Sequence, residues 1–140
     1  MFEIARLPQD FFLHREKFSD QDACVKLAIE LLSAMNELGM TVNARDFIEA
    51  WASGYKVLVE RDDNSKHIIA VALFICDSKF YDFSKTATIL EYAGKNYPQM
   101  IAFAKSVAQA NGAYMLIYDM KEDQQIDNNK FLCKVIKEII

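Results

Sequence analysis

The sequence is short of the residue types that build metal sites and disulfide frameworks. Its 140 residues include three cysteines and two histidines. His14 and His67 lie far apart, and neither has a second histidine or a cysteine at ligand spacing. The cysteines are odd in number and form no paired motif, which favours free thiols in a reducing compartment. The sequence therefore predicts no metal site, no disulfide framework and a cytoplasmic protein.

Long apolar runs and blocks of positive charge are also missing. The longest apolar run, at residues 68–76, is much shorter than the roughly 20 residues that a membrane-spanning helix needs. Residues 1–12 lack the basic-then-apolar order of a secretory signal. The formal net charge is −4 and the basic residues are scattered, so we expect neither nucleic acid nor a membrane surface as a partner.

The sequence also lacks the short motifs of nucleophilic and nucleotide chemistry. It contains no G-x-S-x-G elbow, no P-loop and no paired-cysteine motif. The acidic stretch at 119–127 lacks the spaced ligands and central glycine of a calcium loop. A function must therefore be sought in the order of the secondary-structure elements.

Apolar residues make up 52% of the chain, which is enough for one core, so we expect a single domain over residues 1–140. Ser19 and Asn43 are suited to cap helices, and Gly39 and Gly54 to end them. Residues 11–18 fit either a loop or a turn of helix. The expected strands are 2–7, 55–60, 67–76, 86–93 and 113–118, the expected helices are 20–38, 44–53, 98–111 and 131–139, and the polar connections are 77–84 and 119–129.

Residues 86–120 predict a parallel strand, helix and strand unit, whose first junction is where such units place a ligand. The apolar stripe of its helix is Ile101, Ala104, Val107 and Ala108. Regular alternation in the first strand would put Glu91 on one face with Ala87, Ile89 and Ala93. Glu91, near the carboxyl end of that strand, is either a functional carboxylate or a solvated surface group.

Two local runs and the element order point to a known family. The runs are AKSVAQANGAYMLIYDM at 104–120 and NNKFLCKV at 128–135, and the order is β-α-α-β-β-β-α-β-α. Over essentially the whole chain, the sequence resembles the GNAT superfamily of acyl-CoA-dependent N-acetyltransferases. The resemblance implies an α/β fold with a mixed sheet whose fourth and fifth strands splay apart, with acyl-CoA in the opening.

The resemblance also assigns candidate site residues. Glu91 would be the base that deprotonates an acceptor amine. The family's diphosphate loop, Q/R-x-x-G-x-G/A, corresponds to residues 95–100. The cofactor-binding candidates there are the Lys95 charge and the backbone of Asn96, Tyr97 and Gln99.

Three residues depart from the family's pattern. Pro98 stands where a glycine belongs and lacks an N–H donor, and Met100 adds bulk where a small residue belongs. Matching KFLCKV to the family's R-F-Y-E-K-L helix puts Leu132 where a tyrosine would protonate the CoA thiolate. The neighbouring Cys133 is more typical of packing than of chemistry.

Two functions are consistent with these observations. The first is a non-catalytic GNAT-like domain without a cofactor that binds a protein partner or a second copy through its apolar end at 137–140. The resemblance extends to short GNAT-like chains of tailed phages, so this role includes a virion component. The alternative is an N-acetyltransferase that uses acetyl-CoA.

Overall fold

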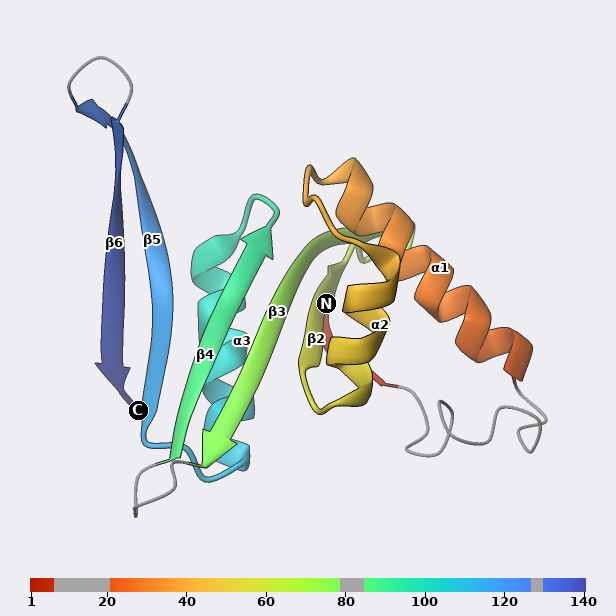
Figure 1. Cartoon of the computed structure of the whole chain (residues 1–140), viewed down its shortest axis with the longest axis horizontal. Helices are drawn as coiled ribbons and strands as arrows, with labels where there is room; N and C mark the ends of the chain where they lie inside the picture. Colours follow the sequence, from red (N-terminus) through yellow and green to blue (C-terminus); the bar gives the residue numbers. More distant parts are fainter. Residues whose placement is uncertain (7–20, 79–84, 127–129) are drawn as a thin grey trace.

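The computed structural model describes residues 1–6, 21–78, 85–126 and 130–140, which form one six-stranded sheet and three helices (Figure 1). In chain order the elements are β1 (Phe2–Ala5), α1 (Gln21–Glu37), α2 (Ala44–Ala52), β2 (Lys56–Arg61), β3 (Ile68–Ser78), β4 (Lys85–Ala93), α3 (Tyr97–Ala110), β5 (Met115–Ile126) and β6 (Lys130–Ile139). The expected mixed α/β architecture is confirmed. The residues at 11–18, Ser19 and most of the connection at 77–84 lie outside the described residues.

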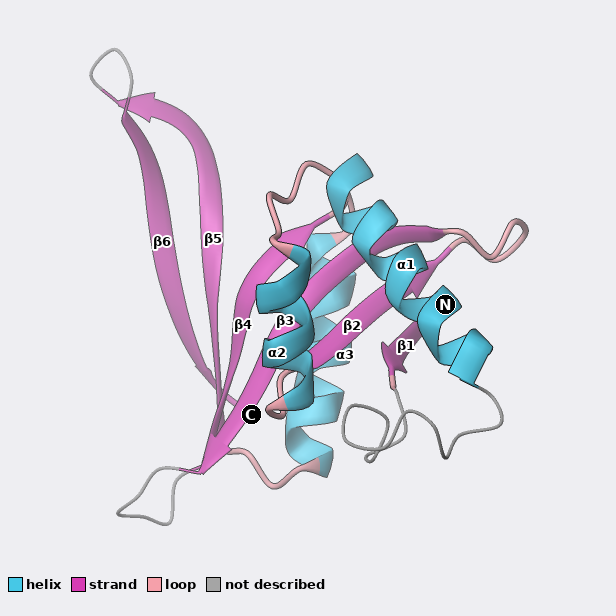
Figure 2. Cartoon of the chain, turned by 45° about the vertical axis from the view of Figure 1, so that its right-hand side comes forward, coloured by secondary structure: helices cyan, strands magenta, loops and turns pink. Residues whose placement is uncertain are grey.

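The strands follow one another across the sheet in the order β1-β2-β3-β4-β5-β6. Every neighbouring pair is antiparallel except β4 and β5, which are parallel and joined by α3. The predicted parallel unit is therefore confirmed. Helix α3 covers one face of the sheet, and α1 and α2 cover the other (Figure 2).

Each face of the sheet has its own apolar core. The α3 face is filled by residues that include Leu58, Phe74, Ile89, Met100, Ala104 and Leu116. The α1 and α2 face is filled by residues that include Leu31, Met35, Phe47, Trp51, Val57 and Val71. Alternate residues of β2 and β3 contribute to the two cores in turn, as expected for strands that are covered on both sides.

The local signals for helix ends are confirmed where the structure describes them. The Asn43 side chain accepts hydrogen bonds from the backbone N–H groups of Arg45 and Asp46, at 2.9 and 3.2 Å, and so caps α2. Gly39 follows α1 with φ of +88°, a conformation that glycine adopts without steric cost. Pro98 lies in the first turn of α3, where no intrahelical donor is needed.

The predicted loop at 119–129 is wrong over 119–126, its last three residues lie outside the described residues, and the predicted last helix at 131–139 is wrong. Strand β5 continues to Ile126, and Lys130–Ile139 forms β6, which pairs with it. The apolar spacing fits a helix, but Ile136 packs on the α3 core while Val135 is 57% and Ile139 is 82% exposed. Valine and isoleucine favour strands, and pairing with β5 satisfies the backbone, so the alternate burial of a half-covered strand results.

Within the described residues, no helix has the length and apolar character needed to cross a membrane.

Candidate functional site

A β-bulge in β4 determines where Glu91 points. Phe74 of β3 pairs with Ile89 and the preceding Leu73 pairs with Glu91, so Leu90 is an extra residue in β4. In a regular strand Ile89 and Glu91 would share a face, and the extra residue places them on opposite faces. Ile89 joins the α3 core, whereas Leu73, the partner of Glu91, packs on the α1 and α2 core. The prediction that Glu91 shares a face with Ile89 is therefore wrong.

Pairing between β4 and β5 stops just before the bulge. The register of the two strands comprises Thr86 with Met115, Ala87 with Leu116 and Thr88 with Ile117. Beyond these pairs the strands diverge toward the carboxyl end of β4 (Figure 1). A bulged strand bends and twists, which is a physical cause for the separation. The predicted splaying of the fourth and fifth strands is confirmed.

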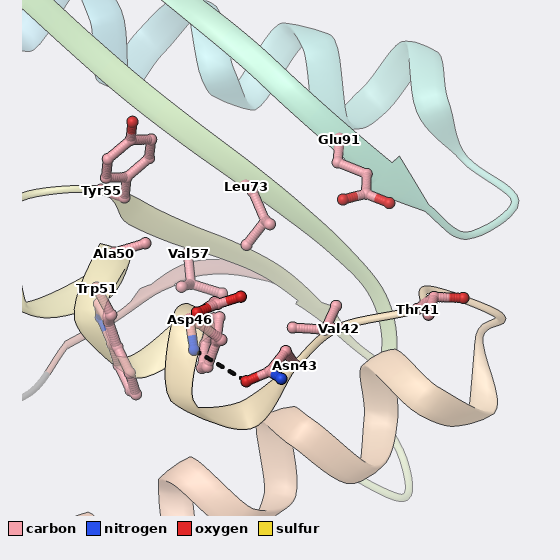
Figure 3. Close-up of a pocket in the computed structure, with 11 residues that line it drawn as sticks. Thr41, Val42, Asn43, Asp46, Ala50, Trp51, Tyr55, Val57, Leu73 and Glu91 are labelled. Carbon is pink, nitrogen blue, oxygen red and sulfur yellow. Dashed lines mark hydrogen bonds between the residues drawn. The ribbon is translucent and has the colours of Figure 1, made fainter.

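Glu91 faces a pocket of about 270 Å³ between α2 and the sheet. The pocket is lined by Thr41, Val42, Asn43, Asp46, Phe47, Ala50, Trp51, Tyr55, Val57, Leu73 and Glu91. Its buried floor is Phe47, Trp51 and Val57, and its exposed rim includes Asp46 and Glu91. Figure 3 shows that Glu91 reaches this space from β4, while Asp46 reaches it from the first turn of α2. Residues from four separate elements therefore form one compartment.

All of the charged residues that line this pocket are acidic. Asp46 and Glu91 are carboxylates, and none of the eleven lining residues is a lysine, arginine or histidine. The floor is aromatic, with the rings of Phe47 and Trp51 5.4 Å apart and tilted by 37°. Such a compartment accepts a positive group at its rim and an apolar body within it. Sequence reasoning missed Asp46 because nothing local distinguishes it from a surface acid at a helix start.

The junction between β4 and α3 is short and tightly packed. Gly94, Lys95 and Asn96 alone separate the two elements. Gly94 has φ of +148°, and a Cβ atom at this position would lie 2.5 Å from the Ala70 Cβ atom. Only glycine lets the chain turn here against β3. Sequence reasoning did not single out Gly94.

The predicted diphosphate residues lie together at the start of α3. Lys95, Asn96 and Gln99 are exposed and Tyr97 is half-buried. Asn96 forms no side-chain cap, and the first turn of α3 holds no acidic residue, so neither compensates the positive end of the helix. Asn96 Nδ2 donates to Glu60 Oε2 at 3.4 Å. A carboxylate of β2 therefore competes with any anion at this helix end.

Met100 does not obstruct the junction. It is fully buried in the core beneath α3. The prediction that it adds bulk to the phosphate loop is wrong, because the helix turns its side chain into the core and away from the loop surface. Pro98 is exposed and still lacks a donor.

Three tyrosines and an ion pair connect α3 to both diverging strands. Tyr97 of α3 stacks on Tyr92 of β4 at 4.5 Å between ring centroids and meets Tyr118 of β5 edge-on at 6.3 Å. The Tyr118 hydroxyl donates to Glu138 Oε2 at 3.0 Å, and Glu138 pairs with Lys105 of α3. The β5 and β6 hairpin is thus held to α3 although β5 has left β4.

The pKa values of this network follow from these contacts. The Lys105 hydrogen bond, helped by Tyr118, lowers the pKa of Glu138. Burial first and the Glu138 carboxylate second raise the pKa of Tyr118. Burial also raises the pKa of Tyr92. The nearby Asn96 backbone acts in the opposite direction and lowers this pKa in part. The Tyr92 hydroxyl has no hydrogen-bond partner within bonding geometry among the described residues.

Comparison with known proteins finds no match among family models or curated proteins, but it does find solved structures of the same fold. A GNAT family acetyltransferase from Staphylococcus aureus matches with a TM-score of 0.55 and 11% identity over 96% of both chains. Glucosamine-6-phosphate N-acetyltransferase from Arabidopsis thaliana matches with a TM-score of 0.51 and 16% identity, over 93% of this chain and 97% of that one. Ribosomal-protein-alanine N-acetyltransferase from Brucella melitensis matches with a TM-score of 0.50 and 14% identity, over 100% and 99%. This chain has the GNAT acetyltransferase fold.

The prediction of a non-catalytic GNAT-like domain is corrected by these matches. The three proteins are named as acetyltransferases, and none is named as a phage or virion component. One of the three departures on which that prediction depended was Met100, which is buried and leaves the loop surface clear. A phage origin stays a prediction.

The GNAT resemblance placed the tyrosine that would protonate the CoA thiolate on a last helix, and this chain does not form that helix. Residues 130–139 are strand β6, so the match of KFLCKV to a helical R-F-Y-E-K-L run is wrong. Leu132 lies in the β6 backbone, and its side chain and that of Cys133 lie outside the described residues. Leu132 therefore cannot be compared with the tyrosine of that helix.

Substituting Gly94 tests how tightly the junction is packed. We expect Gly94→Ala to lower the free energy of unfolding by about 2–4 kcal/mol, because the added Cβ meets Ala70 and the residue keeps φ of +148°. Gly112→Ala is the control, since φ is +78° there but no atom lies within 4 Å of the added Cβ, and it should cost about 1 kcal/mol. Urea denaturation measures both. Equal losses would contradict the close approach to β3.

Proposed function

We propose that this chain is an N-acetyltransferase that transfers the acetyl group of acetyl-CoA to a small amine. The observation that carries the proposal is the bulge at Leu90. It turns Glu91 into an aromatic pocket, and it lies where β4 and β5 begin to separate. In this proposal a base, an acceptor pocket and an opening for the acyl donor meet at one end of β4.

In this proposal Glu91 is the general base. Its carboxylate takes a proton from the acceptor ammonium group, directly or through one water molecule. The neutral nitrogen attacks the thioester carbonyl carbon, the N–C bond forms, the nitrogen releases its second proton to solvent and the C–S bond breaks. The CoA thiolate leaves and takes a proton from solvent, so the products are an amide and free CoA.

The acyl donor is held at the junction between β4 and α3. The backbone N–H groups of Asn96, Tyr97 and Gln99 belong to the start of a helix, where the dipole favours a diphosphate. Lys95 adds a positive charge, while Pro98 removes one donor. The Glu60 carboxylate beside Asn96 opposes the anion. We therefore propose a site for acetyl-CoA that is weaker than one with the full glycine-rich loop.

Replacing Glu91 tests the base. We expect Glu91→Gln to lower kcat by about 100-fold or more, because glutamine cannot take a proton, with acetyl-CoA affinity unchanged. Release of CoA thiol, with 2-phenylethylamine as acceptor, measures the rate. Glu49→Gln removes a charge from α2 outside the pocket and should leave kcat unchanged. Full activity in Glu91→Gln would refute the assigned role.

The acyl-donor site can be tested by removing a positive charge at Lys95 and, separately, a negative charge at Glu60. Acetyl-CoA at 100 times its Kd should stabilise the chain by about 2.7 kcal/mol and raise Tm by several degrees. Lys95→Ala should shrink this shift, whereas Glu60→Gln should enlarge it by removing the competing carboxylate. Lys26→Ala, on exposed α1, is the control. The proposal fails if millimolar acetyl-CoA shifts Tm in none of these proteins.

Association with a second copy is a separate prediction, and strand β6 is the surface that favours it. β6 is an edge of the sheet, with Val135 57% and Ile139 82% exposed. We expect light scattering to show a dimer that Ile139→Lys converts to monomer. Ile29→Lys, at a 58% exposed position of α1, should leave the dimer intact. A monomeric parent chain would exclude this contact.

A further inference from the structure

We infer that the pocket between α2 and β4 takes amines with an apolar, preferably aromatic, body and no acidic group, and that Asp46 is the residue that excludes acidic amines. The inference rests on the proposed function, which makes the ligand of this pocket the acetyl acceptor. It adds the chemical class of that acceptor and a residue that selects it.

The shape of the pocket limits the acceptor to a small molecule or a small end group. About 270 Å³ corresponds to roughly nine water molecules. The buried floor of Phe47, Trp51 and Val57 presents no charged group, so a charged body would lose hydration there without gaining an ionic partner. An aromatic ring or short alkyl body is favoured on this floor.

The charges at the rim select against acids. The ammonium group of the acceptor can approach Glu91, and Asp46 adds a second negative charge on the α2 side of the same compartment. A carboxylate or phosphate on the acceptor would meet two carboxylates and no cation among the eleven lining residues. Repulsion between like charges a few ångströms apart amounts to about a tenfold loss of affinity at a partly apolar surface.

Asp46 also has a role that needs no ligand. It lies in the first turn of α2, where a negative charge complements the helix dipole. That role predicts a uniform loss of stability on substitution. It does not predict a change in the preference between two ligands that differ by one carboxylate, so the two roles can be separated.

Trp51 provides a direct measurement of binding. It is the single tryptophan of the chain and it lines the pocket. Its fluorescence can therefore be titrated with 2-phenylethylamine, phenylalanine and phenylalaninamide in the absence of acetyl-CoA, at slightly acidic pH. Phenylalanine differs from 2-phenylethylamine by its carboxylate. Phenylalaninamide has an uncharged amide of similar size in place of that carboxylate.

We expect saturable binding of 2-phenylethylamine with a Kd at least about tenfold below that of phenylalanine, and binding of phenylalaninamide close to that of the amine. Asp46→Asn should reduce the gap several-fold by improving phenylalanine binding. Glu49→Gln removes the same charge from the same helix outside the pocket and should keep the gap.

Equal affinity for the amine and the amino acid, no saturable change with the amine, or a gap that Asp46→Asn leaves intact would each overturn the inference. The proposed function fails on other readouts, namely the absence of acetyl-CoA binding and of CoA release. A chain that discriminates between the ligands but transfers no acetyl group would keep the pocket assignment and refute the enzyme.

Discussion

One unpaired residue, Leu90, is the constraint on which the site depends. Without it, Glu91 would face the α3 core, where a carboxylate would need a partner or would have to lose its charge. With it, the carboxylate reaches the pocket on the other face, and the bent strand separates from β5. The placement of the Glu91 carboxylate and the separation of the strands thus have a common backbone cause.

The rest of the fold holds this bulge in place from both sides. Ile89 and Tyr92 pack on the α3 core, and Ala93 packs on the α1 and α2 core, so the strand is anchored before and after Leu90. The Lys105, Glu138 and Tyr118 contacts hold the departing hairpin against α3. Where the strands separate, their facing edges lose backbone pairing, so these side-chain contacts replace part of the lost connection.

Local signals in the sequence were sufficient for the helices and for most strands, because caps, glycine ends and apolar periods act within a few residues. The side on which Glu91 lies could not be predicted, since a bulge depends on the register with β3. Residues 131–139 fit both a helical and a strand pattern, and pairing with β5 decided between them. Glu91 could be proposed as a candidate because a carboxylate at a strand end is visible in the sequence, whereas Asp46 joins it in one pocket only when α2 folds over the sheet.

The three-residue junction between β4 and α3 has a mechanical consequence. Because the link is so short and Gly94 lies against Ala70 of β3, α3 and β4 have little freedom to move independently. A ligand that displaces the start of α3 must also displace the end of β4, and with it the carboxylate on the opposite face of the sheet. The position of the helix terminus and the reach of the Glu91 carboxylate are therefore coupled, so under the proposed function binding of one substrate would alter the site of the other.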